Sequence, residues 1–290
     1  MAPVTGAISG DYRRAELARF LRSCRERTSP VDSGLLETMP PRRRIRGLRR
    51  PEVAQLAGVG LSWYTQLEQG REISLTIDVA RSLVGAFSLS SDEEEYLYLL
   101  GGLTAPVDKT DQKLRGHRKK QLAEPQKLAQ PVLVPETDLT EIQLVIDSFN
   151  AGDPIYAISR HWEVLAANSS AEQLLGVRVG TNCLVRMFTE PGRESWYGDP
   201  TTAGRLLVAR YRQQVARYPY DRSLQDTVTM LKRVPSFLAL WERHEVLSLL
   251  PETLSYCAGG IAAPVEYRTM GMVLAAYPSV NLALGVPVTR

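Results

Sequence analysis

The pattern of apolar positions over the first hundred residues predicts five amphipathic helices separated by short turns. Apolar side chains recur every three or four positions in residues 11–29, 50–57, 61–69, 74–88 and 91–101. We expect Asp11 to cap the first helix, which ends near Ser29 and Pro30, and Ser74 or Thr76 to cap the fourth. Five such helices indicate a small all-α domain over residues 1–105.

From residue 138 onward, helical and strand periods alternate along the chain. Helices are predicted over residues 140–150, 201–216, 223–232 and 235–243, with a further helix capped by Asn168. Strands are predicted over residues 154–159 and 162–167, and residues 265–276 and 280–288 form a closing hairpin. Helices set between strand pairs predict an α+β domain over residues 138–290. The whole chain is therefore expected to be mainly α, with two domains.

A segment with little apolar periodicity separates these two regions. Residues 106–137 contain Pro106, Pro125, Pro131 and Pro135 among many lysines and arginines. Such a composition predicts a basic linker. Its charge either adds nonspecific affinity for a nucleic acid or belongs to a solvated tether.

Two of the predicted helices, residues 50–57 and 61–69, are joined by Gly58-Val59-Gly60. Short helices around a glycine corner are typical of a helix-turn-helix. Tyr64 and Leu67 are expected to face inward, and Glu68 to hold the second helix to its neighbours by accepting hydrogen bonds. The residues left on the outer side are the predicted base-reading residues in the major groove of DNA, namely Leu61, Ser62, Thr65 and Gln66.

Charge strengthens this interpretation of the N-terminal region. Residues 1–90 carry 14 basic and 9 acidic side chains, whereas residues 131–290 carry 14 and 16. Six arginines lie within residues 42–50, and like charges held so close repel one another unless a polyanion screens them. A solvated charged face is the alternative to phosphate contact. The predicted DNA phosphate contacts are Arg42, Arg43, Arg44, Arg46, Arg49, Arg50 and Arg71.

Several motifs resemble one family of bacterial regulators. Residues 44–50 (RIRGLRR), 53–59 (VAQLAGV), Trp63-Tyr64 and 67–71 (LEQGR) closely resemble the N-terminal domain of phage-repressor-like (XRE) helix-turn-helix regulators, in the MmyB-like branch. The resemblance implies a five-helix lambda-repressor-like bundle. This chain departs from the family at Gly60 and Ser62, where Ser and Thr are usual, so a helix-capping hydroxyl is lost.

The second half resembles the same regulators, for example in Trp196-Tyr197 and in residues 182–188 and 237–246. The resemblance implies a PAS-like domain that holds a small apolar ligand such as a fatty acid. The tentative pocket residues are Trp162, Arg186, Phe188, Trp196, Arg212, Phe237 and Trp241. Their aromatic rings line a cavity or form simple core. Arg186 and Arg212 meet a ligand carboxylate or form ordinary ion pairs.

Other chemistry has little support in the sequence. His117, His161 and His244 have no partner at metal-ligand spacing, and no nucleophile or phosphate-loop motif occurs. We therefore expect no metal, no cofactor and no catalysis. Cys24, Cys183 and Cys257 are far apart and are expected to be reduced thiols. No apolar run is long enough to cross a membrane, so a cytoplasmic protein without membrane contact is expected.

These features together predict a sequence-specific DNA-binding transcription regulator. Its second domain senses a small apolar ligand, and a homodimer reads two half-sites on double-stranded DNA. Two alternatives remain open at this point. One is an adaptor that binds nucleic acid or protein without ligand control, and the other is a small-molecule enzyme with a helix-turn-helix domain.

Overall fold

The protein is described by a computed structural model that covers residues 5–37, 43–104, 136–149, 152–247, 252–257, 264–274 and 276–288. The chain divides into two compact units, residues 1–117 and 118–290. The predicted linker, residues 106–137, lies outside the described part except for its last two residues. Those two residues already belong to a helix of the second unit.

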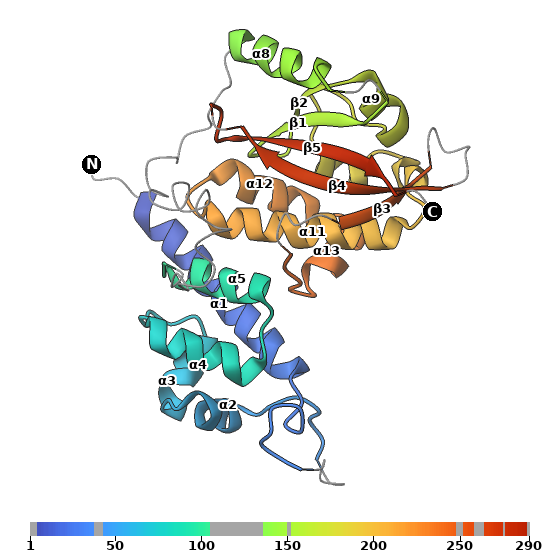
Figure 1. Ribbon diagram of the computed structural model, residues 1–290. Helices are drawn as coiled ribbons and strands as arrows, with labels where there is room; N and C mark the ends of the chain where they lie inside the picture. Colours follow the sequence, from blue (N-terminus) through green and yellow to red (C-terminus); the bar gives the residue numbers. More distant parts are fainter. Residues whose placement is uncertain are drawn as a thin grey trace, which may run out of the picture. The chain divides into compact units, whose positions relative to one another are not determined.

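The first unit is a helical bundle whose elements agree with the predicted pattern (Figure 1). Helix α1 packs against α3 and α5, and α2 packs against α3 and α4. Phe20 and Tyr96 meet edge-on in the core, with ring centroids 5.1 Å apart. The helices are α1 (Thr5–Arg27), α2 (Arg50–Ala57), α3 (Leu61–Glu68), α4 (Ile77–Phe87) and α5 (Ser91–Gly101).

The start of the first helix differs from the prediction. Helix α1 begins at Thr5, so Asp11 lies inside it and does not cap it. The Asp11 carboxylate instead pairs with Arg14, one turn further along. Residues 5–10 contain no proline, the residue that breaks a helix most strongly, so the helix can extend upstream of Asp11.

Caps fix the later helices of the first unit. Thr76 caps α4 by accepting a hydrogen bond from the Val79 backbone N–H at 3.4 Å, as expected. Ser90 caps α5 and exchanges bonds with Glu93 in a capping box. These local bonds fix the start of α4, which packs against α2, and of α5, which packs against α1 and α4.

The second unit is built on a five-stranded antiparallel sheet of order β2-β1-β5-β4-β3 (Figure 1). The predicted closing hairpin is present, with Met270 of β4 opposite Leu284 of β5. This sheet with its helices confirms the α+β PAS-like domain. The strands are β1 (Ile155–Ser159), β2 (Val164–Ala167), β3 (Glu252–Tyr256), β4 (Val265–Val273) and β5 (Val280–Pro287). The edge strand β3 was not among the predicted elements.

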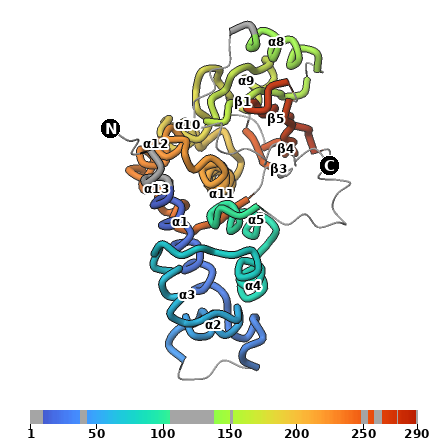
Figure 2. Tube along the Cα trace, turned by 90° about the vertical axis from the view of Figure 1, so that its left-hand side faces the viewer, coloured from blue at the N-terminus to red at the C-terminus, as the bar shows by residue number. Residues whose placement is uncertain are grey.

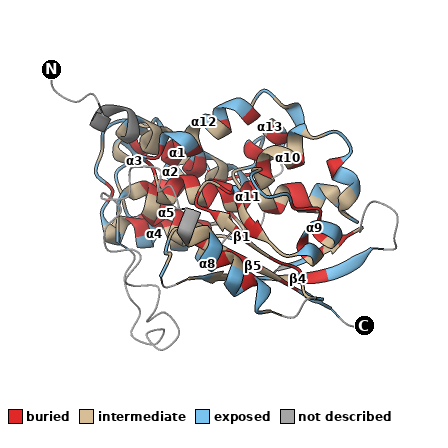
Figure 3. Cartoon of the chain, turned by 90° about the horizontal axis from the view of Figure 1, so that it is seen from above, coloured by how far each residue is buried: buried red, intermediate tan, exposed pale blue. Residues whose placement is uncertain are grey.

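Helices cover the two faces of this sheet. Helix α8 packs its Ile142 and Ile146 against Ile155 and Ala157 of β1 on one face. On the other face, Val164 joins Leu175, Met187 and Leu206 in a second core. Helix α11 is largely buried beneath its neighbours (Figure 3). The helices are α8 (Glu136–Asp147), α9 (Ser169–Leu175), α10 (Cys183–Thr189), η2 (Arg193–Trp196), α11 (Pro200–Arg217), α12 (Arg222–Leu231) and α13 (Pro235–Trp241).

Candidate DNA-binding surface and ligand pocket

The corner between α2 and α3 depends on a glycine. Gly58 ends α2 with φ of 65°, a left-handed conformation that side chains with a Cβ adopt at a cost. The next backbone N–H, of Val59, returns to the Ala54 carbonyl at 3.0 Å. Gly60 then begins α3 with no side-chain cap. The two short helices lie against each other, with α4 beside them (Figure 2).

Helix α3 separates an inner from an outer side. Tyr64 and Leu67 are buried, as the pattern predicts. Leu61 is 47% exposed, and Ser62 and Gln66 are also exposed. The Gln66 amide donates to the Ser62 hydroxyl at 3.3 Å, and the half-buried Thr65 hydroxyl donates to the Leu61 carbonyl at 2.7 Å. The outer side therefore presents a short row of hydrogen-bonding groups next to one apolar side chain.

The Glu68 carboxylate joins α3 to both neighbouring segments. This side chain is 0% exposed and accepts hydrogen bonds from the Arg25 guanidinium of α1 at 2.8 and 3.0 Å. Arg50 of α2 donates to the same carboxylate at 3.0 Å. Although burial opposes ionisation, the Arg25 and Arg50 guanidinium groups hold the pKa of Glu68 below its usual value. The structural role predicted for Glu68 is confirmed.

A second ion pair fixes the arginine-rich segment, residues 43–49. Arg43 makes a two-pronged contact with the Glu52 carboxylate of α2, at 2.6 and 2.7 Å. Its guanidinium also donates to the Gly47 carbonyl at 2.7 Å, and only 5% of the side chain is exposed. The hydrogen bonds from Arg43 hold the pKa of Glu52 below its usual value.

The same segment is tied to α1 through its backbone. The N–H of the fully buried Leu48 bonds to the Arg25 carbonyl at 2.9 Å. A Cβ at Gly47 would lie 2.2 Å from the Glu26 carbonyl oxygen, so only glycine fits there. Residues 43–49 are thus held in a defined course directly before α2.

These contacts change the predicted set of phosphate-binding arginines. Arg43 is 5% exposed and pairs with Glu52, whereas Arg50, at 38% exposed, pairs with Glu68, a carboxylate that it shares with Arg25. Arg42 lies outside the described residues. Four arginines are exposed and have no carboxylate within 4.0 Å in the described part of the chain, namely Arg44, Arg46, Arg49 and Arg71.

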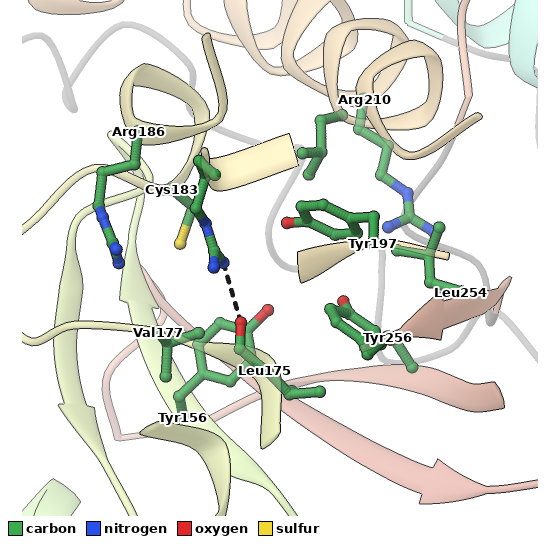
Figure 4. Close-up of a pocket in the computed structure, with 12 residues that line it drawn as sticks. Tyr156, Leu175, Val177, Cys183, Arg186, Tyr197, Arg210, Leu254 and Tyr256 are labelled. Atoms are coloured by element: carbon green, nitrogen blue, oxygen red, sulfur yellow. Dashed lines mark hydrogen bonds between the residues drawn. The ribbon is translucent and has the colours of Figure 1, made fainter. Parts of the chain in front are cut away.

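The second unit contains a pocket between the inner face of its sheet and helices α9, α10 and α11 (Figure 4). Three tyrosines from separate segments surround it, Tyr156 of β1, Tyr197 after η2 and Tyr256 of β3. Burial raises the pKa of all three hydroxyls, so they stay protonated. Its apolar wall includes Leu175, Val177, Leu207 and Leu254, and its basic groups are Arg186, Arg193 and Arg210.

Most of the predicted pocket residues lie elsewhere. Phe237 meets Phe188 edge-on at 5.3 Å and stacks on Trp241 at 5.5 Å, which makes these rings core between helices. Trp162 is buried against Tyr211, with ring centroids 5.3 Å apart. These four aromatic side chains pack against other aromatic rings in the core, and none of them lines the pocket.

The remaining three predicted pocket residues differ in where they lie relative to the pocket. Arg212 is buried with its guanidinium 3.9 Å from the Trp241 ring centroid, and it donates to the Trp241 carbonyl, so it is neither a pocket residue nor a surface ion pair. Trp196 lies beside Arg193 at 5.2 Å, next to the lining residue Tyr197. Arg186 does line the pocket, but it also pairs with Glu190 and donates to the Gly176 carbonyl at 2.9 Å.

Sequence reasoning missed the tyrosines, Arg193 and Arg210. Tyr156 lies in β1 and Tyr256 in β3, and side chains along a strand alternate between the two faces of the sheet. This alternation can predict which face a tyrosine is on, but not which other residues it meets there. No spacing marks residues that meet across different segments.

Cys24, Cys183 and Cys257 are free thiols. No group of three or more potential metal ligands occurs among the described residues. None of the described helices has the length and apolar character needed to cross a membrane.

The first unit thus has the architecture of helix-turn-helix DNA-binding proteins, joined to a PAS-like unit with a pocket. Comparison with protein families gives the same assignment for both domains. Residues 16–97 match a helix-turn-helix domain, and residues 140–272 match the MmyB-like transcription regulator ligand binding domain. A search of curated proteins found no match. The chain therefore carries the two domains of a ligand-responsive transcription regulator of the MmyB-like type.

Proposed function

We propose that the protein reads a specific DNA sequence with the outer side of α3 and holds the phosphates with neighbouring arginines. Support comes from the exposed row of Leu61, Ser62 and Gln66 on a helix that the buried Glu68 fixes in place. Gln66 is suited to a two-pronged contact with adenine, and Leu61 to apolar contact with a thymine methyl. The half-buried Thr65 completes the proposed reading surface.

Phosphate contact is assigned in this proposal to Arg44, Arg46, Arg49 and Arg71. All four are exposed, whereas the fold already uses Arg43 and Arg50. Each lysine or arginine that neutralises a phosphate releases condensed counterions, so binding weakens as salt rises.

The second domain, in this proposal, binds a small and largely apolar ligand, such as a fatty acid, without converting it. The leucines and tyrosine rings of the pocket support that class. A homodimer would place two α3 helices on half-sites about one helical turn apart. Ligand would alter DNA binding only by favouring one arrangement of the dimer over another.

Selection of bound duplexes from a random pool tests the DNA proposal. We expect an enriched site with two-fold symmetry, and Gln66→Ala should relax the preference at one position in each half-site. Arg46→Ala should weaken binding to all duplexes and reduce the salt slope by about 1 per protomer.

Arg43→Ala is the matched control for Arg46→Ala. It removes the same charge from the same segment but breaks the contact with Glu52, so it should lower the stability of the first unit and leave the salt slope of DNA binding unchanged. If no duplex sequence is preferred, the base-reading role of α3 is wrong, and an adaptor without sequence specificity becomes the better description.

A further inference from the structure

The arginine-rich segment before α2, residues 43–49, presents one apolar side chain to solvent. Ile45 is 49% exposed and stands between the exposed Arg44 and Arg46. Among the described residues of the first unit, Leu61 at 47% is the other large apolar side chain with comparable exposure. Leu61 already belongs to the proposed reading surface of α3. Ile45 comes from a different segment and has no part in that proposal.

The backbone around Ile45 is fixed from inside the fold. Arg43 donates from Nε to the Ile45 carbonyl at 2.8 Å and from Nη2 to the Gly47 carbonyl at 2.7 Å. The nearly buried Arg43 guanidinium therefore satisfies both carbonyls without water. Isoleucine is also branched at Cβ, which restricts its χ1 rotamers. The side chain is thus held in a nearly fixed position, so little conformational entropy is lost when a partner covers it.

The segment is bonded to the start of α2, the first helix of the helix-turn-helix. The Glu52 carboxylate accepts hydrogen bonds from the Arg43 guanidinium and from the Arg49 backbone N–H, each at 2.6 Å. When the second helix of such a motif, here α3, lies in the major groove, the first helix crosses the DNA backbone. A segment anchored at the start of α2 is therefore placed beside a phosphate strand, next to the neighbouring minor groove.

The side chains of this segment suit a minor groove. Arginines are attracted to its negative potential, above all where A·T pairs make the groove narrow. Apolar side chains, isoleucine among them, enter the groove as wedges that separate base steps and kink the duplex. Arg44 and Arg46 have no carboxylate within 4.0 Å in the described part of the chain. The segment thus combines the two kinds of side chain that minor-groove proteins use.

We propose that Ile45 enters the minor groove beside each half-site as an apolar wedge, while Arg44 and Arg46 hold the phosphates on either side of it. This inference rests on the proposed reading of DNA by α3 and adds a second contact with base pairs, in the other groove. It predicts A·T pairs at that place and a flexible step such as TA, because such steps are the easiest to unstack.

The test changes the minor groove and leaves the hydrogen-bonding groups of the major groove as they are. Replacing adenine by 2,6-diaminopurine adds to the minor groove the amino group that distinguishes G·C from A·T pairs there. Binding of the full-length protein to the selected duplex, and to the same duplex with diaminopurine, is measured by fluorescence anisotropy. We expect about tenfold weaker binding to the substituted duplex, an effect typical of one wrong base pair.

Ile45→Ala removes the wedge and leaves the carbonyl that Arg43 holds. This variant should bind both duplexes with nearly equal affinity, whereas Leu61→Ala should lose sequence preference in the major groove and keep the tenfold difference. Leu144→Ala is the matched control, since this side chain of α8 is apolar and 65% exposed. It should behave as the unaltered protein does.

A wedge also bends DNA, so energy transfer between dyes at the two ends of the selected duplex gives a second readout. We expect a bend of at least about 20° with the unaltered protein and a smaller bend with Ile45→Ala. Loss of affinity without loss of bending would overturn the wedge.

The outcomes separate the two proposals. Equal affinity of the unaltered protein for both duplexes would overturn the inference and leave reading by α3 standing. A difference between the duplexes that persists in Ile45→Ala would overturn the role of Ile45. If selection enriches no duplex, reading by α3 fails by itself, and an A·T-rich duplex with and without diaminopurine still tests Ile45. Binding to no duplex at all would overturn both.

Discussion

One buried carboxylate carries much of the stability of the helix-turn-helix. Glu68 bonds Arg25 and Arg50 from two other segments, and removing it would leave Arg25 without its partner in a nearly buried position. Breaking one side of a buried pair costs about 3–5 kcal/mol. Since Arg50 is partly exposed, we expect the lower end, about 3 kcal/mol, for Glu68→Ala.

Cys24 offers a local readout for that prediction. It is fully buried in the first unit, and burial raises its thiol pKa to about 12. Alkylation of Cys24 in increasing urea, followed by mass spectrometry, therefore reports opening of this unit alone. Glu72→Ala is the control, because its side chain is 90% exposed. An unchanged midpoint for Glu68→Ala would contradict its structural role.

The same carboxylates predict the response to acid. The folded pKa values of Glu52 and Glu68 lie below the ordinary value of 4.5. A lowered pKa contributes stability that is fully present above pH 4.5 and is lost as pH falls through the folded values. We expect the urea midpoint of the first unit to fall from pH 5 downward, and Glu68→Gln to show a shallower fall. Equal slopes for the two proteins would refute this origin of the acid dependence.

At the scale of elements, two glycines of the first unit should respond in opposite ways to alanine. Gly85 is exposed within α4, and a Cβ there would meet nothing within 4 Å. Gly85→Ala should therefore stabilise the unit by about 0.5–1 kcal/mol. Gly58 also has open space, but its φ of 65° strains any other residue, so Gly58→Ala should cost about 1 kcal/mol. Urea denaturation followed by Cys24 alkylation measures the stability of both variants. Stability changes of the same sign would show that the room available for a Cβ, and not the backbone conformation, decides the effect at these two sites.

Elements were also the level at which the sequence was most informative. Five helical periods and the Gly58 corner suffice to predict the helices of the first unit, since periodicity and turn residues are local features of the sequence. Strand β3 was missed although Leu254 and Tyr256 alternate with polar residues, because five residues give a weak signal. The start of α1 was misplaced because Asp11 is as suitable for an ion pair as for a cap.

The residues of the DNA-binding surface and of the pocket were not equally predictable from the sequence, for a physical reason. The outer side of α3 follows from helix periodicity, so Leu61, Ser62 and Gln66 could be selected without a structure. Whether an arginine side chain is paired depends on carboxylates in other segments, so the pairing of Arg43 with Glu52 and of Arg50 with Glu68 could not be predicted from the arginine run itself. The pocket combines residues from strands and helices far apart in sequence, and size of the aromatic side chain was a poor guide to it.

At the scale of the whole molecule, a regulator must couple its two units. If ligand changes the affinity for DNA by some factor, DNA must change the affinity for ligand by the same factor. We expect reciprocal changes of about 5–150-fold, the usual range for coupled sites. Titrating the selected duplex with and without saturating decanoate, a fatty acid of the proposed ligand class, and titrating decanoate with and without duplex, measures both sides. A large effect of decanoate in one direction and none in the other would mean that it acts outside the folded protein, for instance through micelles.

The ion-pair frame of the helix-turn-helix and its proposed reading side share no side chain. Glu68, Arg25 and Arg50 hold α3 from within, whereas Leu61, Ser62 and Gln66 take no part in that network. Substitutions at these three outer positions therefore leave the ion pairs that stabilise the fold intact. A few substitutions of exposed residues can therefore change which DNA sites the protein recognises, both during evolution and in protein engineering.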